Sequence, residues 1–172
     1  MTATLTIIAE VVVVLGLILA RQLMPRRIKD NPLKLPLILG AFGVVNAASF
    51  IGNHRITPGE VAGLIAGLLV ATIVAWPRAE SMRVWREPDG TWMRQGNLRT
   101  IGWWAVAIAG HVVTAFAGPL MFGEKTHGFG GFDSATMLVY LGVSLGAQAW
   151  FLERRLRHSF GDRRQSAAML LG

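Results

Sequence analysis

The stretch GEVAGLIAGLLVATIVAW, residues 59–76, is apolar throughout except for Glu60 at its start and Thr72 near its end. At about 1.5 Å of rise per helical residue it is long enough to cross most of a hydrocarbon core about 30 Å thick. A helix is favoured because it satisfies its backbone hydrogen bonds internally. Thr57, Pro58 and Glu60 also fit the N-cap, first and third positions of a capping box. The stretch therefore predicts a membrane-spanning helix that begins near Pro58.

Four further apolar runs lie on either side of this stretch. Only 16% of the 172 residues are charged, 52% are hydrophobic, and the mean hydropathy is +0.45. Soluble domains carry about 25% charged residues. We therefore predict an all-α integral membrane protein in which residues 1–158 form a single bundle of five transmembrane helices and residues 159–172 form a mobile cytoplasmic tail. The four other predicted spans are residues 3–23, 35–52, 101–120 and 134–152.

Basic residues alternate along the chain in step with these five runs. Fifteen of the 17 Lys and Arg lie between the first and second runs, between the third and fourth, or after the fifth. The opposite side carries only Arg55 and Lys125. Since basic loops stay in the cytoplasm, the pattern predicts an N-terminus outside and a C-terminus inside. The basic cytoplasmic loops also account for the net charge of +7. They would contact the anionic headgroups of the lipid bilayer, and the charge is not taken as a sign of nucleic-acid binding.

The second basic loop contains RVWREPDGTWMRQGN, residues 83–97. Two partly alternating flanks around Pro-Asp-Gly predict a short cytoplasmic β-hairpin between the third and fourth helices. Trp85 and Trp92 are expected to pack against each other across the strands, with Arg86 and Arg94 beside them. Two interpretations are open. The hairpin is either a flap that lies in the headgroup layer, where Trp is favoured, or a docking surface for a protein partner.

Three polar residues fall inside the predicted spans, where polar groups are costly. Glu10, Asn46 and His111 all lie in the outer half of their helices, at similar depth. One interpretation is a hydrogen-bond network that joins three helices. The other is a ligand-binding site: a Glu–His proton pair, a small-ligand pocket, or His111 as an axial ligand to haem. Every other His lies at or beyond a helix end, so a haem held by two His has no second ligand at matching depth.

Small residues recur every four positions in two of the spans. Gly59, Gly63 and Gly67 form such a stripe in the third span, and Gly142 and Gly146 form a shorter one in the fifth. Stripes of this kind let helix backbones approach closely in membranes. They predict helix packing within a compact bundle or across a homodimer.

The sequence carries no recognisable catalytic machinery. It contains no Cys, which excludes disulfides, thiolate metal sites and thiol exchange by this chain. It also lacks an HExxH motif, a phosphate-binding glycine loop and a nucleophile next to a base. These absences favour a non-enzymatic role with no metal site.

The chain from Arg21 to Thr100 resembles the CcdC-like family of small bacterial integral membrane proteins. The matching stretches are RQLMPRR, TPGEVAGLIAG and RAESMRVWREPDGTWMRQGN. The family is named for cytochrome c biogenesis. The resemblance implies five spans in the bacterial inner (plasma) membrane, and it implies no catalytic residues. Without Cys, any role in cytochrome maturation would be indirect.

Three functions remain open from the sequence. The leading expectation is a non-enzymatic accessory or partner-binding membrane protein whose hairpin is the docking surface. The second is a small-ligand, proton or haem site built on Glu10, Asn46 and His111. The third is a transporter or channel subunit formed by dimerisation.

Overall fold

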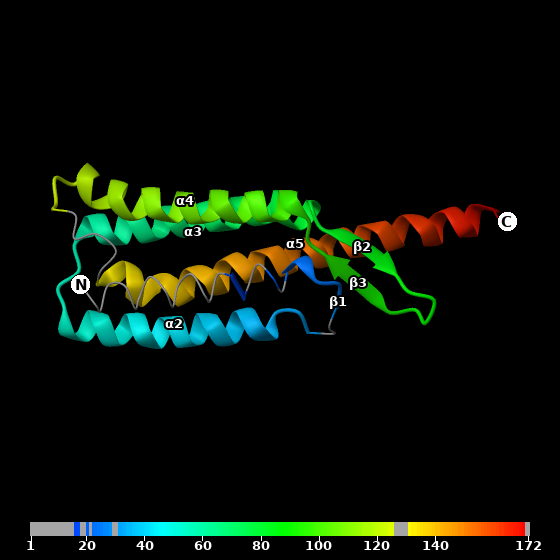
Figure 1. The fold of residues 1–172 in the computed structure, drawn as a ribbon, viewed down its shortest axis with the longest axis horizontal. Helices are drawn as coiled ribbons and strands as arrows, with labels where there is room; N and C mark the ends of the chain where they lie inside the picture. The colour runs from blue at the N-terminus through cyan, green and yellow to red at the C-terminus, as the bar shows by residue number, and fades with distance from the viewer. Residues whose placement is uncertain (1–15, 18–19, 21, 29–30, 126–130, 171–172) are drawn as a thin grey trace.

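A computed structural model describes residues 16–17, 20, 22–28, 31–125 and 131–170, with side chains described as far as Arg157. This part of the chain is a bundle of long antiparallel helices with a small sheet at one end (Figure 1). The helices, in chain order, are α2 (Lys34–Asn53), α3 (Pro58–Glu80), α4 (Leu98–Met121) and α5 (Phe132–Leu170). The strands are β1 (Arg26–Arg27), β2 (Arg83–Arg86) and β3 (Trp92–Gln95).

Within the described residues, four helices are long and apolar enough to cross a membrane. They correspond to the second to fifth predicted spans, so the chain is a helical membrane protein. Most of the first predicted span, including Glu10, lies outside the described residues. Helix α5 extends to Leu170, well past the predicted end of the fifth span at Leu152. The mobility of residues 159–172 stays a prediction.

Local sequence signals set where two of the helices begin. The capping box predicted for the third span is confirmed: the Thr57 side chain accepts a hydrogen bond from the Glu60 amide, and the Glu60 carboxylate accepts one from the Thr57 amide. Helix α4 begins with an equivalent reciprocal pair between Asn97 and Thr100. Each box satisfies amide groups that have no partner within their own helix.

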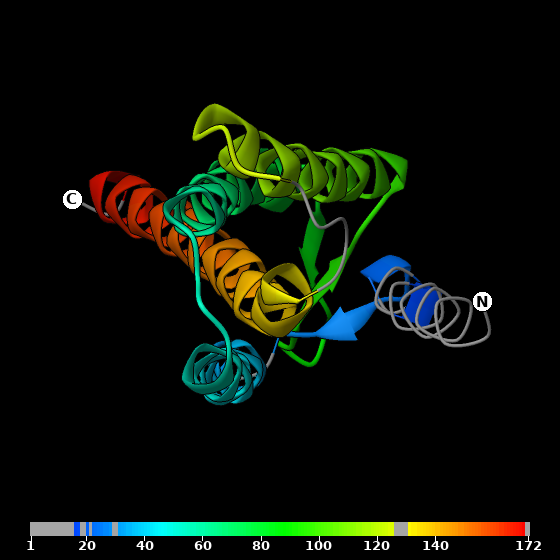
Figure 2. The same cartoon turned by 90° about the vertical axis from the view of Figure 1, so that its left-hand side faces the viewer.

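Helix α3 packs against both α4 and α5, and α2 packs against α5 (Figure 2). Glycine permits the closest approaches. A Cβ added at Gly63 would lie 2.7 Å from the Thr114 carbonyl oxygen of α4. One added at Gly142 would lie 2.7 Å from the Gly40 amide nitrogen of α2. Any side chain larger than hydrogen would force these helices apart.

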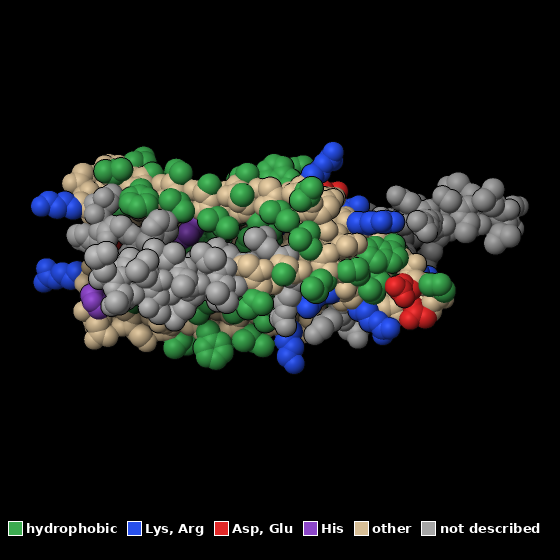
Figure 3. Space-filling model, viewed as in Figure 1, with side chains coloured by type: hydrophobic (Ala, Val, Ile, Leu, Met, Phe, Trp, Pro, Cys, Tyr) green, Lys and Arg blue, Asp and Glu red, His purple; other side chains and the backbone are tan. Residues whose placement is uncertain are grey.

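Large apolar side chains lie on the outer surface of the bundle (Figure 3). Phe42 of α2, Ile73 of α3 and Val113 of α4 are each more than 60% exposed. The buried positions are instead rich in Gly, Ala, Ser and Thr. This distribution suits a lipid environment. Lipid tails are as apolar as the side chains, so burying apolar side chains between helices gains little free energy there.

The predicted hairpin is present, and it belongs to a larger sheet. Strand β3 lies between β2 and β1, and both pairings are antiparallel. The segment just before β1 joins the sheet end as well, since the Gly96 amide donates to the Gln22 carbonyl. Beneath the sheet, Ala79, Met82 and Leu152 form a buried apolar cluster against which Val84 packs. The sheet is therefore built onto the end of α3 and the middle of α5.

Candidate functional site

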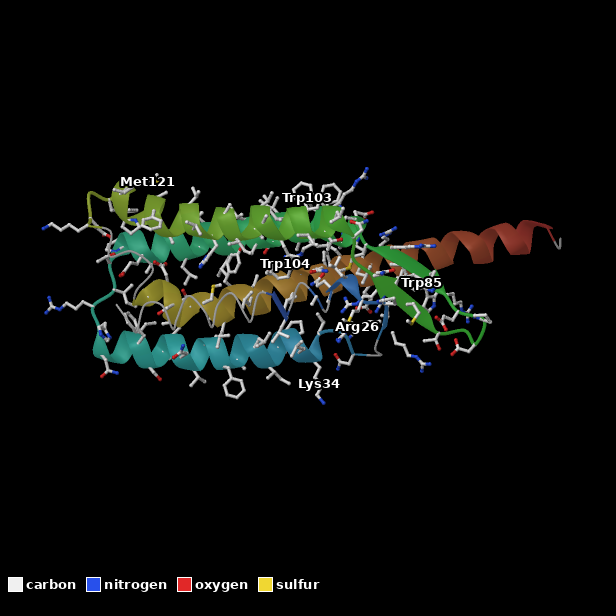
Figure 4. The ribbon with its side chains drawn as sticks, viewed as in Figure 1. Arg26, Lys34, Trp85, Trp103, Trp104 and Met121 are labelled. Carbon is white, nitrogen blue, oxygen red and sulfur yellow. The ribbon has the colours of Figure 1, made fainter. Side chains whose placement is uncertain are left out.

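Two regions of the molecule stand out chemically, and the first is the sheet end. Basic side chains of both loops and of α5 gather there (Figure 3). Figure 4 places Arg26, Lys34 and Trp85 at this end and Met121 at the other. The exposed basic residues of the sheet itself are Arg26, Arg27, Arg83 and Arg86.

The register of the hairpin corrects the expected contact between its two tryptophans. Trp85 lies opposite Met93, and Trp92 lies opposite Arg86. Because neighbouring residues of a strand point to opposite faces, Trp85 and Trp92 lie on opposite faces of the sheet. Each has an arginine beside it: the Arg86 guanidinium is 6.0 Å from the Trp92 ring centroid, and that of Arg83 is 5.7 Å from the Trp85 ring centroid. Cation–π contact thus replaces the predicted stacking.

Two arginines oppose each other across β1 and β3. Arg26 pairs directly with Arg94, so both side chains lie on one face of the sheet. The pKa of Arg94 is lowered, first because burial desolvates its guanidinium and second because of the Arg26 charge. Like charges placed directly opposite each other destabilise a sheet. This face is consequently suited to an anionic group that would lie between the two arginines.

The turn of the hairpin is held by hydrogen bonds of its own. The Thr91 amide donates to the Asp89 carboxylate at 2.8 Å, which lowers the pKa of Asp89. The Arg86 side chain donates to the carbonyl of Gly90, whose φ of +85° is a conformation that glycine adopts readily. The ion pair between Arg27 and Asp89, at 3.9 Å, is well exposed and contributes little.

The second region is inside the bundle, and it differs from the predicted polar cluster. Asn46 is exposed on α2, whereas His111 is buried on α4. The structure does not bring these two side chains into one buried cluster, and Glu10 lies outside the described residues. Equal depth in the membrane does not fix which way a side chain faces, and the cluster of Glu10, Asn46 and His111 stays a prediction.

Helix α5 carries a buried polar stripe that the sequence analysis missed. Four polar residues spaced four apart are each no more than 2% exposed. Residues at this spacing share one helix face. They are Thr136, Tyr140, Ser144 and Gln148. The signal is present in the fifth apolar run as a polar residue at every fourth position.

Two side chains of this stripe, Tyr140 and Gln148, form hydrogen bonds with residues outside α5. The Tyr140 hydroxyl donates to the Ala107 carbonyl at 2.6 Å, and its ring lies 4.3 Å from that of His111. The Gln148 amide donates to the Gln22 side chain at 3.3 Å and contacts the Met82 sulfur. These contacts fasten α5 to α4 and to the residues before β1.

Arg78 contacts the middle of the stripe. The sequence analysis assigned it to a basic loop, but it lies inside α3 and is 0% exposed. Its Nη2 donates to the carbonyl oxygen of Ser144 at 2.6 Å and to the hydroxyl at 3.0 Å. Its guanidinium also lies over the Trp104 ring, 4.2 Å from the centroid. Figure 4 shows Trp104 directed toward α5, whereas Trp103 lies on the outer side of α4.

The polar atoms around Arg78 are not all paired. Within the described residues, Arg78 Nε, Arg78 Nη1 and Trp104 Nε1 are buried and have no hydrogen-bond partner. Most buried polar groups in proteins do have one, so each exception needs a physical account.

The predicted packing glycines lie at helix contacts of different closeness. Gly59, Gly63 and Gly67 face α4 residues, while Gly142 faces α2. A Cβ at Gly146 would meet Pro36 only at an ordinary 3.5 Å.

No group of three or more His, Asp or Glu among the described residues is placed to hold a metal ion. Comparisons with protein-family models, with curated proteins and with solved structures gave no match to this chain.

Proposed function

We propose that the protein is a non-enzymatic accessory protein of a bacterial inner membrane and that its basic sheet binds an acidic segment of a partner protein. In this proposal the chain spans the membrane five times with the N-terminus outside, which puts the sheet in the cytoplasm. The resemblance to the CcdC-like family is part of the same proposal. The orientation is supported by the concentration of Arg and Lys at the sheet end.

The observation that carries the proposal is the cross-strand pair Arg26 and Arg94. Arg94 is half-buried and has a lowered pKa, so the pair lacks the full solvation that would weaken its repulsion. A carboxylate between the two guanidinium groups would relieve the repulsion and accept hydrogen bonds from both. The strand pairing holds the two arginines in place before the partner arrives, which lowers the cost of binding.

A sheet anchored on helices suits protein docking better than a free loop would. An isolated two-stranded hairpin is marginally stable in water. Here β1 adds a third strand, and Arg155 of α5 donates hydrogen bonds to the carbonyls of Glu80 and Met82 that precede the hairpin. These supports keep the surface formed without a partner.

Site-specific photo-crosslinking in native membranes tests the proposal. A photoreactive residue replaces Arg86, which is exposed and lies on the same face of the sheet as Arg94. We expect a crosslinked protein band that is lost in Arg94→Gln and retained in Arg157→Gln. Arg157 is the matched control because it is exposed and pairs with Glu153 on its own helix.

The two possible occupants of the surface give different products. Crosslinks to a protein that disappear with Arg94→Gln support the proposal. Crosslinks to lipid alone would contradict it and would assign the sheet to the headgroup layer.

A further inference from the structure

Arg78 has an unusual position for an arginine near the end of an apolar helix. Helix α3 ends at Glu80, only two residues later. Arginine at such a place normally extends outward so that its charge reaches the headgroup layer. Side chains of a helix point back toward its N-terminus. The Arg78 side chain therefore points away from the end of α3, and its guanidinium contacts Ser144 and Trp104 inside the bundle. The charge is therefore held inside the bundle, where it is fully desolvated.

The contacts of Arg78 satisfy only part of its bonding capacity. Ser144 accepts from Nη2 alone, and the Trp104 ring faces the guanidinium without accepting from Nε or Nη1. No carboxylate pairs with Arg78 in any ion pair of the described residues. A buried charge without a counter-ion costs several kcal/mol, far more than one neutral group without a partner.

A missing acceptor with negative charge would resolve both problems. Water would accept the hydrogen bonds and leave the charge uncompensated. A carboxylate or phosphate oxygen would accept at least one of them and also neutralise the charge, and arginine binds both groups well. The indole N–H of Trp104 offers a third donor beside Arg78.

We propose that Arg78 and Trp104 form an oxyanion-binding site inside the sheet end of the bundle, which takes a carboxylate or phosphate group. The ligand is either a free anion or the phosphate of a lipid headgroup. Arg78 lies two residues from the end of α3, at the end of the molecule where the basic residues gather. This site is separate from the surface pair Arg26 and Arg94 and does not depend on the partner proposed above.

The test measures the thermal unfolding of the full chain in a maltoside detergent, which contains neither phosphate nor carboxylate. Inorganic phosphate or acetate is added at constant ionic strength. We expect a saturable rise in the unfolding midpoint. Arg78→Met should abolish the rise. Trp104→Phe removes only the indole N–H and keeps an aromatic ring, so it should weaken the apparent affinity by about tenfold.

Two controls separate specific binding from a general effect of salt. Arg99→Met removes an exposed arginine near the start of α4 and should leave the response unchanged. In the absence of anions, Arg78→Met should be at least as stable as the unsubstituted protein, because an uncompensated buried charge is removed. If Arg78→Met does not fold, Trp104→Phe decides the question.

A second arm of the experiment identifies the source of the anion. A phospholipid or a phosphate-free glycolipid is added in place of the free anions. Stabilisation by free phosphate or acetate that requires Arg78 supports a soluble ligand, and stabilisation by phospholipid alone supports a headgroup. If no addition stabilises the unsubstituted protein more than Arg78→Met and Trp104→Phe, the proposal is wrong and Arg78 only fastens α3 to α5.

Discussion

The substitution Gly118→Ala tests how closely α3 and α4 are packed. A Cβ at Gly118 would lie 2.7 Å from both the Cα and the amide nitrogen of Gly63 and would also meet the Gly59 carbonyl oxygen. These are backbone atoms, so they cannot rotate away as a side chain would. Ordinary contact begins at 3.4 Å, so the helices would have to separate by at least about 0.7 Å at this point.

The magnitude follows from the loss of packing along this contact. A gap of about 0.5–1 Å forfeits a quarter to a half of each attractive contact. Insertion of a methyl group into a filled interface costs about 1–3 kcal/mol. Alanine also has a helix propensity about 1 kcal/mol better than that of glycine, which partly masks the loss.

A matched control removes the propensity contribution. Gly102 lies on the same helix, is exposed, and has nothing within 4 Å of an added Cβ. Gly102→Ala therefore gains the propensity without the clash. We expect Gly118→Ala to unfold with a free energy about 1–3 kcal/mol lower than that of Gly102→Ala. The measurement is a reversible titration with a denaturing detergent followed by circular dichroism. Equal stability of the two variants would refute the close packing.

Two further predictions concern single polar contacts. Tyr140→Phe removes the hydroxyl that donates to Ala107 but keeps the ring against His111. We expect the free energy of unfolding to fall by about 0.5–1.5 kcal/mol in the same titration. An unchanged value would mean that the hydroxyl does not make this bond. The pKa of Asp89 is lowered by the bond from Thr91, so its contribution to the turn is present above its unfolded pKa of about 3.9 and is lost as the pH falls through the lower folded value. The protection factor of the Thr91 amide, which is its exchange rate corrected for the intrinsic effect of pH, should fall on acidification, and an unchanged protection factor in Asp89→Ala would contradict this role.

The sequence predicted the helices better than it predicted the interior of the bundle. Apolar length locates a span because the bilayer imposes that length, and the Thr57 capping box located the start of α3 to the residue. The Pro-Asp-Gly turn predicted the hairpin but not the register of its strands. Trp85 and Trp92 were therefore wrongly expected to contact each other. A shift of one residue in register moves a side chain to the other face.

The interior was missed because depth along a helix does not determine the direction of a side chain. Asn46 faces outward although it lies at a depth similar to that of His111. Arg78 was taken for a loop residue because positive charge near an apolar run usually marks its end. Only the packing of three helices shows that its side chain is directed inward. Strand β1 was not predicted, because two residues are too few to show an alternating pattern.

The pairing of β1 with β3 constrains the order of biogenesis. Strand β1 leaves the ribosome before α2 and α3, whereas β3 follows both. The strands β1 and β3 therefore cannot pair until α2 and α3 have both crossed the bilayer and brought the chain back to the side where β1 lies. If only one of the two helices crossed the bilayer, β1 and β3 would lie on opposite sides of the membrane and could not pair.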